Sequence, residues 1–264
     1  MDYVALSLFD LGMAALLILI NGGLSVALGL GLERTLAINT LRMVVQLAAI
    51  GFVLKFIFSQ SGPWWTFGWA FVMLAVAGYE IIARQTYQLK GFLAYGLGTV
   101  TLMLVGFVCT GFAIGLLIAP EPWYAPRYVL PILGMMLGNT MTGIALGIET
   151  LSVAIKKGQD VIEAQLLLGA SRMEALKDYM RQALKSGMMP IINAMAASGI
   201  VSLPGMMTGQ IIAGVDPIDA TKYQLMIMFL IAGGTALGTT AGVYGMAYLL
   251  TDERHRLRAE RLTG

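Results

Sequence analysis

Long uncharged apolar runs follow one another along almost the whole chain, and these runs limit the folds that it can adopt. A helix that crosses a bilayer needs about 20 mostly apolar residues. Runs of that size are Leu11–Leu32, Phe56–Tyr79, Gly91–Pro120, Tyr128–Ile148, Ser186–Val215 and Tyr223–Thr251. A weaker run, Thr40–Phe58, has Arg42 and Lys55 near its ends, and their long side chains can reach the headgroups. The sequence therefore predicts an all-α, polytopic membrane protein with about seven transmembrane helices.

The composition supports this class and excludes others. Hydrophobic residues make up 58% of the chain and charged residues 12%, whereas soluble domains have roughly 45–50% and about 25%. The Gly-x-x-x-x-Gly-Lys-Ser/Thr phosphate loop is missing, and no predicted span contains Asp or His, so neither ATP hydrolysis nor intramembrane proteolysis is expected. Cys109 is the single cysteine and cannot form an intrachain disulfide. We expect one transmembrane domain over residues 1–264 that is not an enzyme and does not bind nucleic acid.

The distribution of lysine and arginine predicts the orientation. Lys156–Lys185 is the only long polar segment between spans, and six of its residues are basic. Basic loops stay in the cytoplasm, and with seven spans this choice leaves only Lys55, Arg127 and Lys222 outside among 17 lysines and arginines. We therefore expect an outside N-terminus, a cytoplasmic segment at 156–187 between helices five and six, and a cytoplasmic C-terminus with a basic tail at 252–264.

The cytoplasmic segment is too short to be a domain, but it has the pattern of a helix that a soluble partner can push. Gly169 is expected to divide it into two short helices, because glycine is a weak helix former. The apolar residues that can face one side are Leu166, Leu167, Met173, Leu176 and Met180. An apolar edge of this kind suits the docking of an external motor. The alternative is a helix that only lies on lipid headgroups.

Two segments in the predicted outer half of the membrane repeat the same glycine and methionine spacing, Gly134–Gly143 and Gly205–Gly214. Glycines four residues apart let helices pack closely, and the methionines either fill gaps or line a path. The candidate path residues, which include polar and ionisable side chains in or near the spans, are Glu80, Met135, Met136, Asn139, Glu149, Met206, Met207 and Gln210. For Glu80, an ion pair with Arg84 one turn along is the plain alternative.

Proline and glycine predict a helix break in the sixth span. Pro204 and Gly205 lie deep inside it, and proline removes a helical hydrogen bond. Transporters often bind substrate at such breaks, but a packing kink has the same signature. The candidate break or gate residues are Pro204, Gly205 and Gly209. Pro131 and Pro190 are expected near helix starts, where proline is tolerated. A further glycine set, expected to be a helix-packing face, is Gly234, Gly238 and Gly242.

The cytoplasmic segment resembles the coupling loop of ABC-importer membrane subunits, in which Glu-Ala-Ala is followed after three residues by Gly. Glu163, Ala164 and Gly169 match this pattern, whereas Gln165 departs from it. The Ile-x-Leu-Pro part of the importer pattern is not clearly present, so the match does not imply import. The residues that the resemblance implies in coupling to an ATPase are Glu163, Ala164, Leu167, Gly169, Ala170 and Arg172.

A longer resemblance covers most of the chain. Gly199–Pro217, Leu130–Asn139 and Leu166–Ser171 are similar to marked segments of the FetB-type family of ABC-transporter permeases. The resemblance implies a homodimer in the bacterial cytoplasmic (inner) membrane, driven by two copies of a separate subunit that binds ATP and Mg²⁺, so that this chain holds no cofactor itself. Bacterial members are associated with iron export, and plant relatives with aluminium tolerance or with export of a nucleotide sugar.

The residues themselves leave the cargo open. Iron and aluminium ions prefer oxygen ligands, and each chain offers only Glu80 and Glu149 near its spans. The methionines suit a softer ion such as Cu(I), whereas a metal chelate or an organic solute needs fewer charged ligands. No metal ligands are assigned. The expectation from the resemblance is export of iron or a related metal. The alternatives are export of an organic solute such as a nucleotide sugar, and a channel or membrane scaffold that has no motor.

Overall fold

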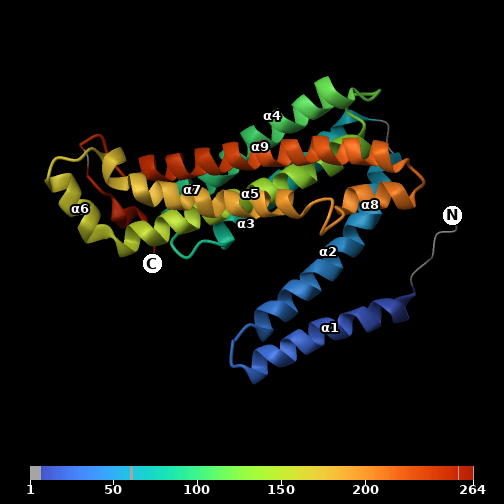
Figure 1. Ribbon diagram of the computed structural model, residues 1–264, viewed down its shortest axis with the longest axis horizontal. Coiled ribbons are helices and arrows are strands. Elements are labelled where there is room, and N and C mark those ends of the chain that lie inside the picture. The colour runs from blue at the N-terminus through green and yellow to red at the C-terminus, as the bar shows by residue number, and fades with distance from the viewer. Residues whose placement is uncertain (1–6, 60–61, 255, 264) are drawn as a thin grey trace. The chain divides into compact units, whose positions relative to one another are not determined.

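Helices are the only regular elements in the part of the chain that the computed structural model describes, which is residues 7–59, 62–254 and 256–263. They form two compact units, residues 1–61 and residues 62–264 (Figure 1). Within the described residues, six helices are long and apolar enough to cross a membrane. The prediction of an all-α, multi-pass membrane protein is confirmed. Positions 255 and 264 of the predicted basic tail lie outside the described residues.

The first unit is a pair of helices, α1 (Leu8–Ala27) and α2 (Glu33–Ser59), joined by a short turn. Gly29 and Gly31 have φ values of 62° and 68°, a region that glycine enters without steric strain. Ser25 ties the turn together, because its hydroxyl donates to Glu33 Oε2 at 3.0 Å and accepts from a backbone N–H on the far side of the turn. The weak second span is therefore a full helix. It begins at Glu33, before the predicted Thr40, so its charged first turns are also helical.

The second unit contains the remaining helices, and the two candidate functional sites described below lie in it. Its long helices are α3 (Pro63–Ala83), α4 (Phe92–Phe112), α5 (Pro126–Lys157), α7 (Arg172–Ala197) and α9 (Pro217–Leu249). Its short helices are a π-helical continuation of α4 (Ala113–Ile118), α6 (Gln159–Leu167), α8 (Gly205–Ile212) and a 3-10 turn (Ala259–Arg261). Figure 1 shows α5, α7 and α9 side by side, with α6 at one end of them and α8 at the other.

Glycines bring α5, α7 and α9 into close contact. A Cβ atom at Gly187 of α7 would lie 2.5 Å from the carbonyl oxygen of Gly143 on α5 and 2.5 Å from Thr239 Cγ2 on α9. The α5–α9 contacts move toward the C-terminus of both helices, from Met136 beside Gly234 to Ile148 beside Gly242, so α5 and α9 are parallel. The α5–α7 contacts run in opposite directions, with Gly143 beside Gly187 and Gly147 beside Ala183, so α7 is antiparallel to both. The predicted packing face on α9 is confirmed, because the residues that contact Met136, Thr140, Ile144 and Ile148 of α5 are Gly234, Gly238 and Gly242.

The predicted sixth span is not one helix, and this part of the prediction is wrong. Residues 186–215 are divided between the second half of α7 and the short helix α8, with an irregular turn at 198–204. Pro204 is the N-cap of α8, so the predicted break is real. The expectation that Pro190 lies near a helix start is also wrong, because α7 begins at Arg172 and carries Pro190 in its interior. Pro131 lies in the second turn of α5.

The helices that flank the polar segment are much longer than their apolar runs. At 1.5 Å per residue, the 32 residues of α5 extend about 48 Å, whereas the hydrocarbon core is about 30 Å thick. α5 is therefore roughly 18 Å longer than this core is thick. The polar first half of α7 and the last turns of α9 pack against the C-terminal end of α5, and we call these three helix ends the stalk.

The C-terminal tail folds back on the stalk end of the unit. Asp252 accepts a hydrogen bond from the Arg256 backbone N–H and another from its guanidinium, at 2.9 and 2.8 Å. Because of these bonds, led by the backbone donor, the pKa of Asp252 falls to about 2. Thr263 N–H donates to the carbonyl of Gln88 at 2.7 Å, and Arg261 Nη1 donates to the carbonyl of Leu249 at the end of α9. The described residues of the predicted basic tail thus contact both the end of α9 and the α3–α4 loop.

Candidate functional sites at the two ends of the helical unit

The tip of the stalk is α6 and the turn that follows it, which we call the α6 tip (Gln159–Arg172). The turn is built by its sequence. Gly169 has φ +95°, and Ala170 N–H donates to the carbonyl of Gln165 at 3.1 Å, the hydrogen bond that ends a helix at a left-handed glycine. Ser171 and Glu174 then form a capping box that starts α7. The prediction that Gly169 ends a helix is confirmed, but only α6 is short.

The α6 tip presents apolar side chains to the surroundings. Leu167 is 89% exposed and Leu168 is 88% exposed, although both lie at the end of the molecule that carries most of its charge. Glu163 is also exposed and accepts a hydrogen bond from Gln159 Nε2 at 2.8 Å, and Ala164 lies beside it on α6. Of the predicted apolar side, Leu176 and Met180 are instead buried in α7. Exposed leucines in a polar segment mark a surface that either another protein or the lipid headgroups contact.

Basic side chains of the tail lie next to α6. A hollow of about 320 Å³ is lined by Glu163, Leu166, Leu167, Arg254, Arg256 and Leu257. The end of the α6 tip contacts α9, because the Arg172 guanidinium lies 4.7 Å from the centre of the Tyr248 ring.

At the opposite end, a cavity of about 260 Å³ opens between α5, α8, α9 and the π-helical turn. We call it the α8 cavity. Its lining residues are Ile118, Arg127, Tyr128, Pro131, Ile132, Met135, Met206, Gln210, Val215 and Tyr223. It brings together three predicted path residues that are far apart in the sequence, Met135, Met206 and Gln210. The Oε1 atom of Gln210 is buried and has no hydrogen-bond partner in the described structure.

The sequence around α8 explains how this cavity is held open. Pro204 starts the helix, and Gly214 ends it with φ +92° and a hydrogen bond from Val215 N–H to the carbonyl of Gln210 at 3.0 Å. Asp216 then caps α9 by accepting from Ile218 N–H at 2.9 Å. A helix of eight residues, fixed at both ends, thus projects Met206 and Gln210 toward α5 and α9.

Several predicted path residues have structural partners elsewhere. Glu149 accepts hydrogen bonds from the backbone N–H and the hydroxyl of Thr86, at 2.8 and 2.6 Å, and so holds the α3–α4 loop. Glu80 lies 3.9 Å from the Arg84 guanidinium, as the plain alternative expected. Met136 is buried against Gly234. These residues and the α8 cavity are therefore different places, and their part in a path stays a prediction.

Of the other predicted residues near α8, Met207 contacts α9 and Asn139 is exposed. Met207 Sδ accepts from the Thr221 hydroxyl at 3.9 Å, which joins α8 to α9. Asn139 is exposed on α5, and its Nδ2 donates to the Met135 carbonyl at 2.9 Å. Gly205 and Gly209 have open space where a side chain would be, so neither is a packing glycine within this chain.

Metal ligands do not gather anywhere in the described part of the chain, which contains no group of three or more His, Cys, Asp or Glu side chains. Cys109 is buried as a free thiol. The residues present therefore do not form a site of the kind that holds a hard metal ion by several carboxylates.

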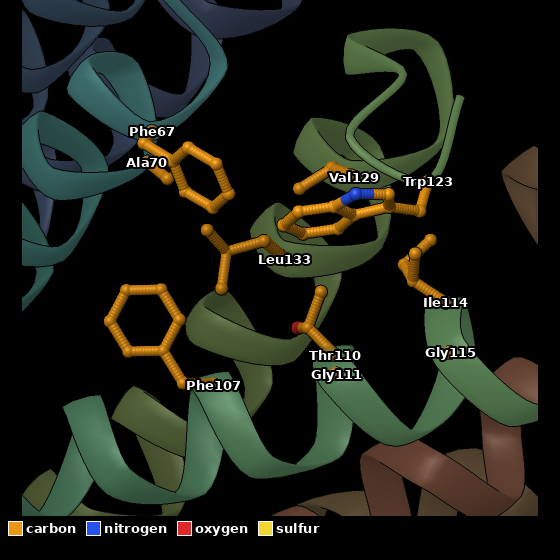
Figure 2. Close-up of a pocket in the computed structure, with 10 residues that line it drawn as sticks. All are labelled: Phe67, Ala70, Phe107, Thr110, Gly111, Ile114, Gly115, Trp123, Val129 and Leu133. Carbon is orange, nitrogen blue, oxygen red and sulfur yellow. The ribbon is translucent and has the colours of Figure 1, made fainter. Parts of the chain in front are cut away.

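A second cavity, of about 340 Å³, is apolar and contains none of the predicted site residues (Figure 2). Figure 2 shows the Trp123 and Phe107 rings on two sides of it, with Leu133 of α5 between them and Thr110 of α4 below. The Trp123 ring lies 5.7 Å from that of Phe67, centre to centre. Trp123 is 61% exposed.

Sequence reasoning missed the residues that give the α8 cavity its polarity, namely Arg127, Tyr128 and Tyr223. Arg127 was placed in a loop by its charge, and the signal that was available is its position next to Pro126, which starts α5. It also missed that Arg254 and Arg256 line a hollow together with α6 residues, because no local pattern places the tail beside α6.

Comparisons with known proteins agree on one family. The family model described as "Uncharacterised protein family (UPF0014)" matches residues 8–250. A UPF0014 membrane protein of Synechocystis is 38% identical over 77% of this chain and 79% of its own length. The Arabidopsis protein ALUMINUM SENSITIVE 3 is 32% identical over 92% of this chain and 89% of its own. The probable iron export permease protein FetB of Escherichia coli is 30% identical over 96% and 95%. No solved structure matches. A family match along nearly the whole chain, with relatives that align over most of their length, shows that this chain belongs to the UPF0014 family of membrane proteins.

Proposed function

We propose that this chain is the membrane-spanning subunit of an ATP-driven exporter and that an ATPase subunit binds its α6 tip. The observation that carries the proposal is the exposure of Leu167 and Leu168 at the end of a stalk made from α5, α7 and α9. A folded protein gains little by holding two leucines in water, and burying each under a partner is worth about 1.5–3 kcal/mol. The partner supplies the ATP and Mg²⁺.

The stalk gives the ATPase a mechanical connection to the membrane. From Lys157 to Met135, α5 is continuous, and 22 residue steps correspond to about 33 Å. Because α7 is locked to α5 and α9 around Gly187, a displacement of α6 moves all three helices as a packed group. At its far end α7 stops and the chain turns into α8, so the motion reaches the α8 cavity. Transporters use such rigid-body movement for alternating access.

The orientation that we propose has the α6 tip in the cytoplasm and the α8 cavity on the outer side, with an outside N-terminus. Lys156, Lys157 and Arg172 lie at the α6 end with the arginines of the tail, whereas Arg127 and Lys222 lie at the other. This asymmetry follows the positive-inside rule. Seven crossings result if α7 and α8 together cross the membrane once.

We further propose a homodimer in the bacterial cytoplasmic membrane that carries two ATPase subunits and exports iron or a related metal. The printed name of the Escherichia coli relative, a probable iron export permease, supports export and iron. The second candidate cargo is an organic solute such as a nucleotide sugar, and the lack of a carboxylate cluster in the described residues favours it. A channel or scaffold without a motor is the competing function.

The test is co-purification of the full chain with its candidate ATPase subunit, in a variant carrying Leu167→Ser and Leu168→Ser. Losing about 3–6 kcal/mol of apolar contact weakens binding by roughly 150- to 25,000-fold, so the ATPase should no longer co-purify. The matched control is Ile218→Ser, which removes a 68% exposed aliphatic side chain at the opposite end of α9. Undiminished ATPase binding by the double variant would overturn the proposal.

A further inference from the structure

α5 exposes an asparagine near the middle of the membrane. Asn139 lies about 18 Å along the helix axis from Arg127 and about 15 Å from Glu149, at 1.5 Å per residue, and it is exposed. Its Nδ2 donates to the Met135 carbonyl, but among the described residues its Oδ1 atom accepts no hydrogen bond. Polar side chains at this depth face protein or a water-filled cavity rather than lipid. We therefore expect a contact for Asn139 beyond those of its own unit.

The turn at 198–204 is a second feature that lipid does not cover well. Gly187 lies beside Gly143, and this antiparallel register brings the end of α7 level with Leu133, about 9 Å along α5 from Arg127. The helix therefore ends within the apolar layer, where irregular backbone occurs only against protein or a water-filled cavity. Ile200 is 97% exposed, so the described residues leave the turn open. An exposed isoleucine suits protein better than water as the cover.

Asn139 and the turn lie on the same side of α5. Met135 is one helical turn before Asn139, and it lines the α8 cavity together with Met206, so α8 and the turn that leads into it pack on that side. The opposite side of α5 is covered by α4, whose Gly106 lies beside Leu137. We call the open surface the Asn139 face, and its members are Gly138, Asn139, Thr142 and Leu146 of α5 and residues 198–204.

We propose that a second copy of this chain covers the Asn139 face, and that the two Asn139 side chains pair across the two-fold axis. Identical residues meet at such an axis, and an amide carries both a donor and an acceptor, so two asparagines can bond reciprocally. Gly138 has open space where a Cβ would be, which lets two backbones approach closely. None of the members of the face is charged, so two copies meet without repulsion.

This inference rests on the proposed homodimer and gives it an interface. It also places the predicted path residue Asn139 and the break before Pro204 between the two copies. In transporters, discontinuous helices line the substrate path at the interface between structural repeats. A second copy supplies that other half here. The competing covers of the face are the first unit, α1 and α2, and lipid.

The first experiment is cysteine cross-linking in native membranes, in a Cys109→Ala background. Asn139→Cys and Thr142→Cys are oxidised separately, because a disulfide needs Cβ atoms about 3.5–4.5 Å apart and only positions near the axis meet this requirement. Both should give a covalent dimer on a denaturing gel. The matched control is Val108→Cys, which is 66% exposed on α4, and it should remain a monomer on the gel.

The second experiment measures dimer dissociation in lipid vesicles by energy transfer between labelled chains. Asn139→Leu should weaken the dimer by about tenfold, because interhelical hydrogen bonds are lost, and Asn139→Gln should retain most of the affinity. Gly138→Leu should also weaken it by about tenfold or more, because the side chain blocks close approach. The matched control is Gly111→Leu on α4, where nothing lies within 4 Å of the Cβ, and it should leave the dimer unchanged.

Three results would overturn the inference. They are a chain that is monomeric in membranes, a dimer that Gly138→Leu and Asn139→Leu leave equally tight, and a disulfide within one chain between Asn139→Cys and Phe52→Cys of α2, which would identify the first unit as the cover. ATPase co-purification is measured on the same samples and depends on the α6 tip. Its absence from an intact dimer would count against the proposed function, whereas a monomer that still binds the ATPase would count only against this interface.

Discussion

Replacement of Gly187 by alanine is the sharpest test of the packing that joins the two candidate sites. The added Cβ would lie 2.5 Å from the carbonyl oxygen of Gly143 and 2.5 Å from Thr239 Cγ2. The threonine can rotate, but the carbonyl belongs to the backbone of α5. Because a carbon atom cannot remain this close to it, α7 must move away from α5, and the contact among the three helices loosens.

The expected effect follows from two opposing terms. Overpacking of a close contact costs typically about 1–3 kcal/mol, and alanine recovers up to about 1 kcal/mol of helix propensity relative to glycine. The net loss in the free energy of unfolding is therefore about 1–2 kcal/mol. For a chain of this size each kcal/mol corresponds to about 2–4 °C, so Gly187→Ala should lower the melting temperature by about 2–8 °C.

The assay is thermal unfolding of the purified protein in one detergent, followed by fluorescence-detected size exclusion. The matched control is Gly233→Ala on α9, where nothing lies within 4 Å of the added Cβ, and this variant should be as stable as the unmodified chain or slightly more stable. If Gly187→Ala melts no lower than Gly233→Ala, the close packing of α5, α7 and α9 described above is refuted.

Three further predictions concern the stalk end. Gly169→Ala places a Cβ on a residue with φ +95°, which costs about 1 kcal/mol or more. It should weaken ATPase co-purification, and unchanged binding speaks against the turn as the docking point. Glu149→Gln removes the charge from the hydrogen bonds to Thr86 and should speed amide exchange in the α3–α4 loop, with exchange at α8 as the internal control. Asp252 has a pKa lowered to about 2, so its bonds to Arg256 persist above the ordinary carboxyl pKa near 3.8 and are lost as the pH falls toward 2. Tail exchange, corrected for its intrinsic pH dependence, should rise over that interval, and Asp252→Asn should abolish this rise.

The membrane class and most helices are predictable because apolar runs of about 20 residues have few alternatives in a bilayer. The span that failed shows the limit of this reasoning. Residues 186–215 are apolar throughout, but where the helix starts is decided by the capping box at Ser171 and where it stops by the turn before Pro204. A hydropathy pattern contains neither the helix cap nor the turn. For this reason Pro190 was expected near the start of a helix, whereas it lies inside α7.

The candidate sites were predictable in part. The Glu163–Gly169 spacing predicted the turn of the α6 tip. The turn can be predicted from local sequence, because Gly169 ends α6 in a left-handed conformation and Ser171, two residues later, caps α7. The α8 cavity needed the fold. Met135, Met206 and Gln210 were candidates by type, but only the packing of α5, α8 and α9 places them around Arg127. Glu149 was expected near the path for its charge, and its pairing with Thr86 depends on a contact between residues 63 positions apart.

Transport by reconstituted vesicles tests the central claim most directly. The chain and its ATPase are placed in proteoliposomes with radioactive iron as ferric citrate, and iron movement is followed with ATP on the side of the α6 tip. We expect movement that requires ATP hydrolysis, that persists in Ile218→Ser and that disappears in the variant carrying Leu167→Ser and Leu168→Ser. Movement that needs no ATP, or that survives in the double variant, would contradict a transporter driven through the α6 tip.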